Sequence, residues 1–180
     1  SRNGDQLLVA SGVPGLYGNA LLFDVGTGDL VREMVGHRDL LYMARFSPDG
    51  TTIATAGYDR EIVLWDRATG AELKRLTGHN GAIFDVAFSP DSKVLATACA
   101  DETVKIWSVA TGERLDTLSQ PEGEVLAVEI TPDGKSVIAA SADNYLRVWR
   151  LLSVDRPRIN PLVTSRFLDE SPLIRLRFTP

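Results

Sequence analysis

The chain has 180 residues, 44% of them apolar and 24% charged, a balance that excludes collagen-like, low-complexity and intrinsically disordered chains. The net charge is −5 and no stripe of Lys or Arg is present, so nucleic acid is not expected as a partner. No apolar run approaches the roughly 18 residues that cross a bilayer, so no membrane partner is expected either and the chain is expected to be soluble. The single cysteine, Cys99, cannot form an intrachain disulfide.

Each part of the chain is predicted to form short antiparallel strands, because β-rich runs alternate with turn signals throughout. The first strands are predicted at 40–46, 83–89 and 124–130, and the second strands at 52–56, 94–98 and 137–141. The third strands are predicted at 61–65, 103–107 and 145–149, and the fourth strands at 71–76 and 113–118. Ser47-Pro48-Asp49-Gly50 has the residues of a type I turn and predicts a hairpin between a first and a second strand.

These strand groups belong to an internal repeat of 42 residues. Tryptophan, aspartate and a Gly-His pair recur at this spacing. The recurring positions are Trp65, Trp107 and Trp149; Asp59, Asp101 and Asp143; and His37 and His79. Phe23 stands 42 residues before Trp65, so a first, divergent unit precedes the others. The predicted units cover approximately residues 1–46, 47–88, 89–130 and 131–178.

Residues 36–66 carry the full combination of Gly-His, Ser-Pro-Asp-Gly, a turn aspartate and a final Trp-Asp, and residues 78–108 repeat it with a final serine. In these motifs the chain resembles the WD-repeat β-propeller family, and the turns at 66–70 and 108–112 look similar to those of bacterial members. The resemblance implies an all-β fold of four-stranded antiparallel blades. Four blade equivalents are expected, in a partial propeller or in half of a dimeric ring.

The resemblance also implies a buried hydrogen-bond chain within each complete blade. Its members are His37, Thr55, Asp59 and Trp65 in one unit and His79, Thr97, Asp101 and Trp107 in the next. Because a catalytic site is one constellation and not a copied feature, the repetition favours a structural role, and no catalytic residue, metal or cofactor is expected.

Two units depart from this pattern. The last Trp unit keeps Asp143 and Trp149 but has Pro121 and Ala139 in place of His and Thr, which predicts a broken polar chain. Asp143→Ala is therefore expected to cost less stability than Asp101→Ala. The first unit has Phe23 and an insertion around residues 12–19. Both units are expected to be held mainly by apolar packing.

The predicted function is a non-catalytic scaffold that binds protein or peptide partners at the propeller rim and channel mouth. The candidate contacts are Tyr42, Tyr58, Phe84, Leu126 and Ile174. Aromatic residues are frequent in binding hot spots, but Tyr42 and Phe84 could equally plug the channel or pack between blades. The alternatives are a propeller enzyme with a channel site and a propeller fragment that only self-assembles. Cys99 is expected to be a small, buried thiol.

The ends of the sequence share one register of the repeat. Residues 1–4 stand at the Ser-Pro-Asp-Gly position, and residues 172–178 are predicted to form an innermost strand. That strand is expected to pair with residues 6–10, in the same chain or in a second copy, or else further blades belong to a longer parent chain. Because the faces of isolated blades need cover, self-association as a dimer is expected.

Overall fold

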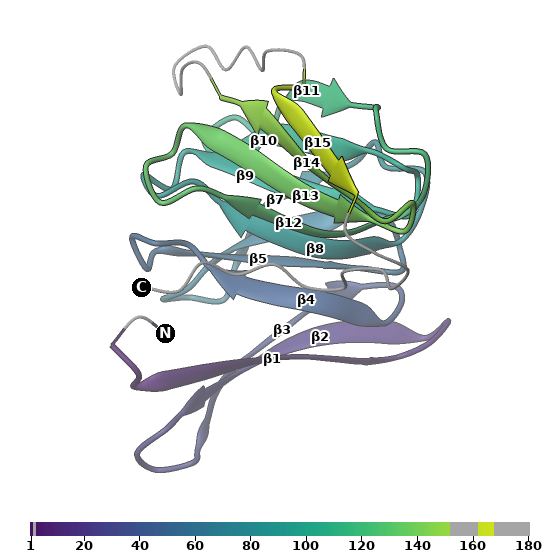
Figure 1. Ribbon diagram of the computed structural model, residues 1–180. Coiled ribbons are helices and arrows are strands. Elements are labelled where there is room, and N and C mark those ends of the chain that lie inside the picture. Colours follow the sequence, from purple (N-terminus) through teal and green to yellow (C-terminus); the bar gives the residue numbers. More distant parts are fainter. Residues whose placement is uncertain (2, 152–161, 168–180) are drawn as a thin grey trace. The chain divides into compact units, whose positions relative to one another are not determined.

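The computed structural model describes residue 1, residues 3–151 and residues 162–167, and every regular element in this part of the chain is a β-strand (Figure 1). The chain divides into two compact units, Ser1–Ile83 and Phe84–Pro180. Within the described residues, no helix has the length and apolar character that a membrane crossing requires.

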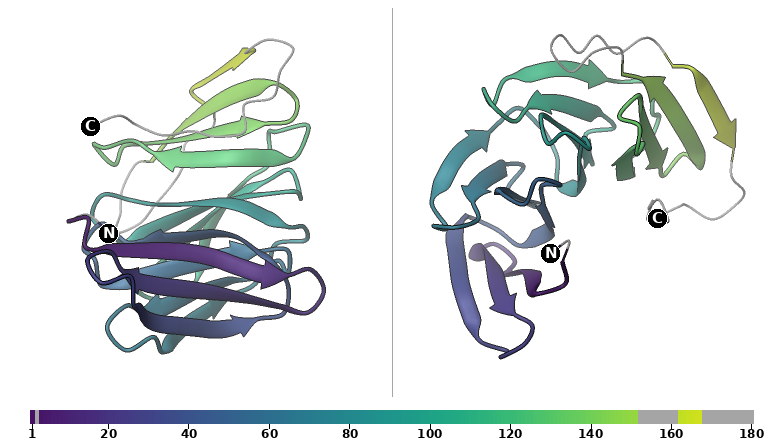
Figure 2. Two further views of the ribbon diagram at one scale, coloured as in Figure 1. Left: turned by 90° about the horizontal axis from the view of Figure 1, so that it is seen from below. Right: turned by 90° about the vertical axis from the view of Figure 1, so that its left-hand side faces the viewer.

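The first unit contains two antiparallel sheets. Three strands form one sheet, in the order β1 (Gln6–Val13), β2 (Tyr17–Asp24) and β3 (Leu30–His37). Four strands form the other, in the order β4 (Leu41–Phe46), β5 (Thr52–Gly57), β6 (Ile62–Asp66) and β7 (Glu72–Leu76). The predicted insertion lies in the long hairpin of β1 and β2, which is drawn in purple in Figure 2. It therefore lengthens two strands and does not form a separate loop.

The second unit contains two four-stranded antiparallel sheets. One has the order β11 (Arg114–Leu118), β10 (Val104–Ser108), β9 (Val94–Cys99) and β8 (Ile83–Phe88), whose first residue is the last of the first unit. The other has the order β12 (Val125–Ile130), β13 (Ser136–Ser141), β14 (Tyr145–Arg150) and β15 (Thr164–Phe167). Each sheet thus runs in chain order from one edge to the other.

The hairpin turn after β4 is fixed by its serine and glycine. In the turn between β4 and β5, Gly50 N donates to Ser47 O (2.9 Å) and Thr52 N donates to Ser47 Oγ (2.9 Å). Gly50 has a φ of 74°, a left-handed conformation that glycine adopts without steric cost. Ser1 accepts the same two bonds, from Gly4 N (3.2 Å) and Gln6 N (2.9 Å). β1 therefore corresponds to the second strand of a repeat.

Each unit has its own apolar core between its two sheets. In the first unit, Leu22 and Met34 of the three-stranded sheet pack in one cluster with Ile53 and Trp65 of the four-stranded sheet. In the second unit, one cluster joins residues of all strands from β8 to β14 and includes the fully buried Trp149. Because each sheet is small, burying one of its faces requires a neighbouring sheet.

The predicted all-β class and the antiparallel strand groups are confirmed, and the predicted strands agree with the observed ones within one residue at either end. The strand predicted at 172–178, with the candidate contact at position 174, lies outside the described residues. The boundaries of the repeat units stay predictions. Among the described residues, no strand lies beside the outer edge of β1, so the first sheet has three strands where the others have four.

Candidate functional site

A continuous hydrogen-bond chain crosses the four-stranded sheet of the first unit. His37 Nδ1 lies 2.8 Å from Asp59 Oδ2, and His37 Nε2 lies 2.7 Å from Thr55 Oγ1. Trp65 Nε1 donates to the same hydroxyl oxygen at 2.7 Å. In the neutral imidazole this geometry fits a proton on Nδ1, with Nε2 accepting the hydroxyl proton of Thr55. His37, Thr55 and Trp65 are all buried.

The carboxylate of Asp59 is held by backbone donors as well. Arg38 N donates to Oδ2 (3.1 Å) and Glu61 N donates to Oδ1 (3.3 Å). Burial raises the pKa of Asp59, but the hydrogen bond to His37, the charge of that imidazole when protonated and the two backbone bonds lower the pKa by more. Asp59 is therefore more acidic than an ordinary aspartate and stays ionised at neutral pH.

Asp59→Ala is expected to lose about 1–3 kcal/mol of unfolding free energy at neutral pH, because His37 and two turn amides lose their acceptor. Since the folded-state pKa is lowered, this stabilisation is complete above the ordinary value of 3.8 and is lost as the pH falls through the folded-state pKa. Urea melts between neutral pH and pH 3 should show the difference from wild type shrinking below that value. Asp29→Ala, at an exposed turn, is the control; a difference that stays constant with pH would contradict the assignment.

The next repeat shows part of the same arrangement in the second unit. Trp107 Nε1 donates to Thr97 Oγ1 at 3.0 Å, which corresponds to the bond between Trp65 and Thr55. His79 belongs to the first unit and Asp101 to the second, and each unit is described by itself, so the bonds expected of His79 stay a prediction.

Asp101 has a partner that the sequence pattern did not single out. Lys105 Nζ donates to Asp101 Oδ2 (2.9 Å) and to Thr103 Oγ1 (3.0 Å), and the lysine is buried. Thr103 Oγ1 in turn donates to Asp101 Oδ1 (2.6 Å). The ammonium group, the hydroxyl and the carboxylate therefore form a compact, partly buried cluster at the turn between β9 and β10.

In this repeat Asp143 and Trp149 are not joined through a His and a Thr, since Pro121 and Ala139 stand there, but each has another polar partner. Arg147 Nη1 lies 2.7 Å from Asp143 Oδ2 and also donates to Ser141 Oγ (2.9 Å). The hydroxyl of Ser141 donates to Asp143 as well. The indole of Trp149, which has no threonine partner, donates from Nε1 to Gln120 Oε1 (3.1 Å). This sheet is thus held by polar contacts as well as by apolar packing.

One position of the repeat explains both cationic partners. Val63, Lys105 and Arg147 follow one another at the 42-residue spacing, each four residues after a turn aspartate. A cation at this position lies beside the aspartate of its own sheet in two repeats. The repeat spacing was therefore the signal that could have found these residues.

Of the predicted contact residues, two are brought together on the surface of the first unit. Tyr42 is 41% exposed and Tyr58 is 55% exposed, and their ring centroids lie 6.3 Å apart. The two residues come from β4 and from the turn after β5, which are adjacent because Leu41 pairs with Gly57. Phe84 and Leu126 belong to the second unit and are half-buried there. Cys99 is buried, as expected.

A hollow of about 420 Å³ adjoins this aromatic pair and has Tyr58 in its wall. Asp39 and Glu61 also line it. Both carboxylates are already engaged, since Asp39 accepts from Gly15 N (2.7 Å) and Glu61 pairs with Arg75 (2.6 Å). The exposed rings are therefore the part of this surface best suited to bury a partner's side chain.

Comparison with known proteins agrees with this architecture. A family model for the WD domain, G-beta repeat, matches residues 28–66, 70–108 and 112–150, which together make up more than half of the chain. The chain is also similar to the Intraflagellar transport protein 122 homolog of Danio rerio, with 31% identity over 61 residues. That match covers 34% of this chain and 5% of the fish protein, so it spans only a small part of that relative. With three matched repeats on four small antiparallel sheets, the chain belongs to the WD40 repeat family.

Proposed function

We propose that this chain is a non-catalytic scaffold that binds a protein or peptide partner at the surface formed by Tyr42 and Tyr58. WD40 repeats are of the protein-interaction scaffold type, which supports the general role. The observation that carries the proposal is the pair of exposed, adjacent tyrosine rings. Such rings bury a large area at a small entropic cost, because each has only two rotatable side-chain bonds.

The chemistry of the repeat histidines supports a non-catalytic role. A nucleophile and its base need a free face toward a substrate. In the first unit, both ring nitrogens of His37 are engaged by Asp59 and Thr55, and the hydroxyl of Thr55 also accepts from Trp65. These groups stabilise the sheet by satisfying one another.

The Tyr42→Ala/Tyr58→Ala variant tests the proposal. Partners captured by the wild-type chain from cells of its source are expected to bind the variant at least about tenfold more weakly in a direct titration, because hot-spot aromatics supply much of the binding energy. Tyr17→Ala is the matched control, since Tyr17 is 45% exposed on the hairpin of β1 and β2. Equal binding by the double variant and by the control would overturn the proposal.

A second property, self-association, is supported by the outer face of the first sheet. Its inner face packs in the core, whereas the outer face carries Leu7, Val9, Leu21, Phe23, Leu30 and Val35. Leu7 is 55% exposed and Val35 is 63% exposed. Ile53 and Trp65 form the equivalent cross-strand pair of the neighbouring sheet, where both of these side chains are buried. Cover by a second copy or by further blades is the role this face fits.

A further inference from the structure

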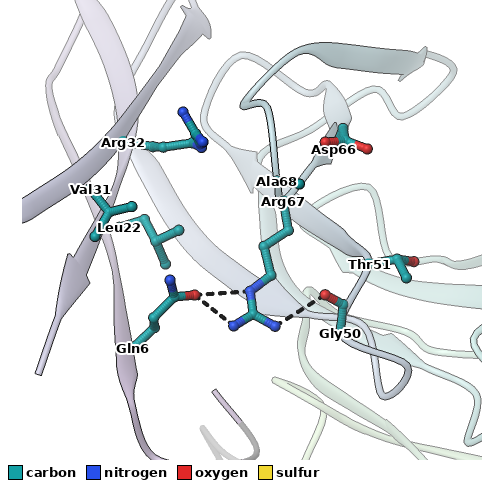
Figure 3. Close-up of a pocket in the computed structure, with 9 residues that line it drawn as sticks. All are labelled: Gln6, Leu22, Val31, Arg32, Gly50, Thr51, Asp66, Arg67 and Ala68. Atoms are coloured by element: carbon teal, nitrogen blue, oxygen red, sulfur yellow. Dashed lines mark hydrogen bonds between the residues drawn. The ribbon is translucent and has the colours of Figure 1, made fainter.

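The junction between the two sheets of the first unit joins two unlike faces. The cross-strand pair Leu8–Leu22 of the first sheet packs in one cluster with the pair Ile53–Trp65 of the four-stranded sheet. Figure 3 shows the edge of this junction, where Leu22 of the first sheet and Arg67 of the other line the same space. We name the side of a sheet with the tryptophan position its tryptophan face. Here a tryptophan face packs on the opposite face of the sheet that precedes it in the chain.

The junction inside the second unit has the same polarity. The pair Ala96–Ile106 of the β8–β11 sheet packs in one cluster with the pair Val137–Trp149 of the β12–β15 sheet. Again the tryptophan face belongs to the later sheet and the opposite face to the earlier one. Because two junctions in two separate units agree, this polarity is a property of the repeat.

The outer face of the first sheet is a tryptophan face that stays exposed. Phe23 stands at the tryptophan position and pairs across the strands with Leu7. Leu7 is more than half exposed, whereas Ile53 and Val137 at the same position of later repeats are buried. The polarity of the junctions predicts that this face binds the opposite face of another sheet. Contact between two outer faces would join two tryptophan faces, which neither unit shows.

The β12–β15 sheet carries an opposite face of the required kind. Ile138 and Val148 pair across the strands at the positions that Ala96 and Ile106 hold in the sheet before it. Because side chains alternate along a strand, this pair lies on the side turned away from Trp149, which we name the far face. Ala96 and Ile106 are completely buried, but Ile138 and Val148 are only half-buried.

The charges on these two faces are complementary. Arg166 of β15 lies on the far face, at the repeat position of Met34. In the first unit, Arg75 on a tryptophan face reaches the strand of Met34 and donates from Nη2 to Gly36 O at 3.2 Å. Glu33 stands 42 residues before Arg75 and is exposed on the outer face of the first sheet. Neither Glu33 nor Arg166 forms an ion pair with any residue that the structure describes. A carboxylate and a guanidinium thus stand at positions that meet in the junction.

We propose that the outer face of the first sheet binds the far face of the β12–β15 sheet of a second copy. Ile138 and Val148 of one copy cover Leu7 and Phe23 of the other, and Arg166 approaches Glu33 of that copy. A second copy is the occupant because it carries both of the missing faces, so two copies joined twice leave neither face open. The inference rests on the self-association proposed above and adds that the contact joins unlike faces.

The test uses two variants of the 180-residue chain that each block one face. Leu7→Glu/Val35→Glu blocks the outer face, and Thr164→Glu/Arg166→Glu blocks the far face. The last two positions are exposed, so the fold tolerates these changes. Each variant alone should associate at least about tenfold more weakly than wild type, because glutamate replaces an apolar or cationic contact. An equimolar mixture should form a species of two chains, one of each variant, because one intact face remains on each.

Sedimentation velocity with a different fluorophore on each variant measures this mixed species, and its formation also shows that both variants are folded. Thr111→Glu/Arg114→Glu is the matched control for the far face, since it changes the same residue types at exposed positions of the neighbouring sheet. This control should associate like wild type.

The outcomes separate the direction of the contact from self-association itself. If two outer faces bind each other, Thr164→Glu/Arg166→Glu alone associates like wild type and the mixture forms no mixed species. That result, or wild-type association by both variants, would overturn the inference and leave self-association standing. A wild-type chain that associates while the variants stay separate on mixing would also overturn it. A monomeric wild-type chain would overturn self-association and the inference together.

Discussion

Asp143→Ala is expected to lower the free energy of unfolding by about 3 kcal/mol, a loss similar to that for Asp101→Ala, which leaves the buried Lys105 without its counter-ion. Arg147 is only 7% exposed and pairs with Asp143 at 2.7 Å, so the variant leaves a buried guanidinium without its counter-ion. Glu122 N and Tyr145 N also lose their acceptor. The absence of His and Thr partners predicts a smaller loss at Asp143 than at Asp101, but a buried cation lies beside each aspartate, so the two losses are expected to be similar.

A second variant distinguishes the ion pair from the turn itself. Asp143→Ala/Arg147→Met should recover most of the lost stability, since replacing both members of a buried pair by apolar groups is often close to neutral. Urea melts of both variants and of Glu122→Ala, an exposed acid nearby, measure the comparison. No recovery in the double variant, or a loss no larger than that of Glu122→Ala, would show that the ion pair does not stabilise this sheet.

The stability that Asp143 contributes is expected to decrease at acidic pH. Burial raises the pKa of Asp143, but the bonds from Ser141, from two backbone amides and from Arg147 lower it by more. Stability from this group is therefore complete above the ordinary carboxyl pKa of 3.8 and is lost as the pH falls through the lowered value. The difference between wild type and Asp143→Ala should shrink over that range.

The sequence predicted the strands well because the repeat gives each of them several independent signals. The 42-residue spacing fixed the register of Trp65 and Trp107, and the Ser-Pro-Asp-Gly turn fixed where the first hairpin closes. Because turn chemistry and periodicity agree, the predicted strands begin and end within one residue of the observed ones.

The polar partners were harder to predict, because a charged residue in a strand usually marks an exposed position. Lys105 and Arg147 are buried instead, since a turn aspartate of the same sheet lies beside each. Gln120 bonds to Trp149 from outside the 42-residue motif, and Gln6 bonds to Arg67 across 61 residues. The two glutamine contacts depend on how distant parts of the chain pack, and no local pattern encodes them.

We also expect the 180-residue chain to self-associate, with a large effect on its mass in solution. Light scattering across a dilution series is expected to give a mass above the 19.6 kDa of one chain, with a dimer as the main species, because the outer face of the first sheet exposes apolar side chains. Leu7→Glu/Val35→Glu should weaken the assembly at least about a hundredfold, since each buried carboxylate costs several kcal/mol. Both positions are more than half exposed, so the fold tolerates the change.

Leu16→Glu/Val25→Glu is the matched control, because it adds the same charge and removes two exposed apolar side chains from turns that flank the sheet face. This control should associate like wild type.

Deleting residues 171–180 separates two modes of assembly. If strand exchange at the edge of β1 holds the copies together, the deletion abolishes association while the control does not. If the outer face alone holds them, the glutamate pair abolishes association and the deletion does not. A folded wild-type chain that stays at 19.6 kDa at every concentration would overturn both modes, because obligate association ties the assembled fraction to concentration.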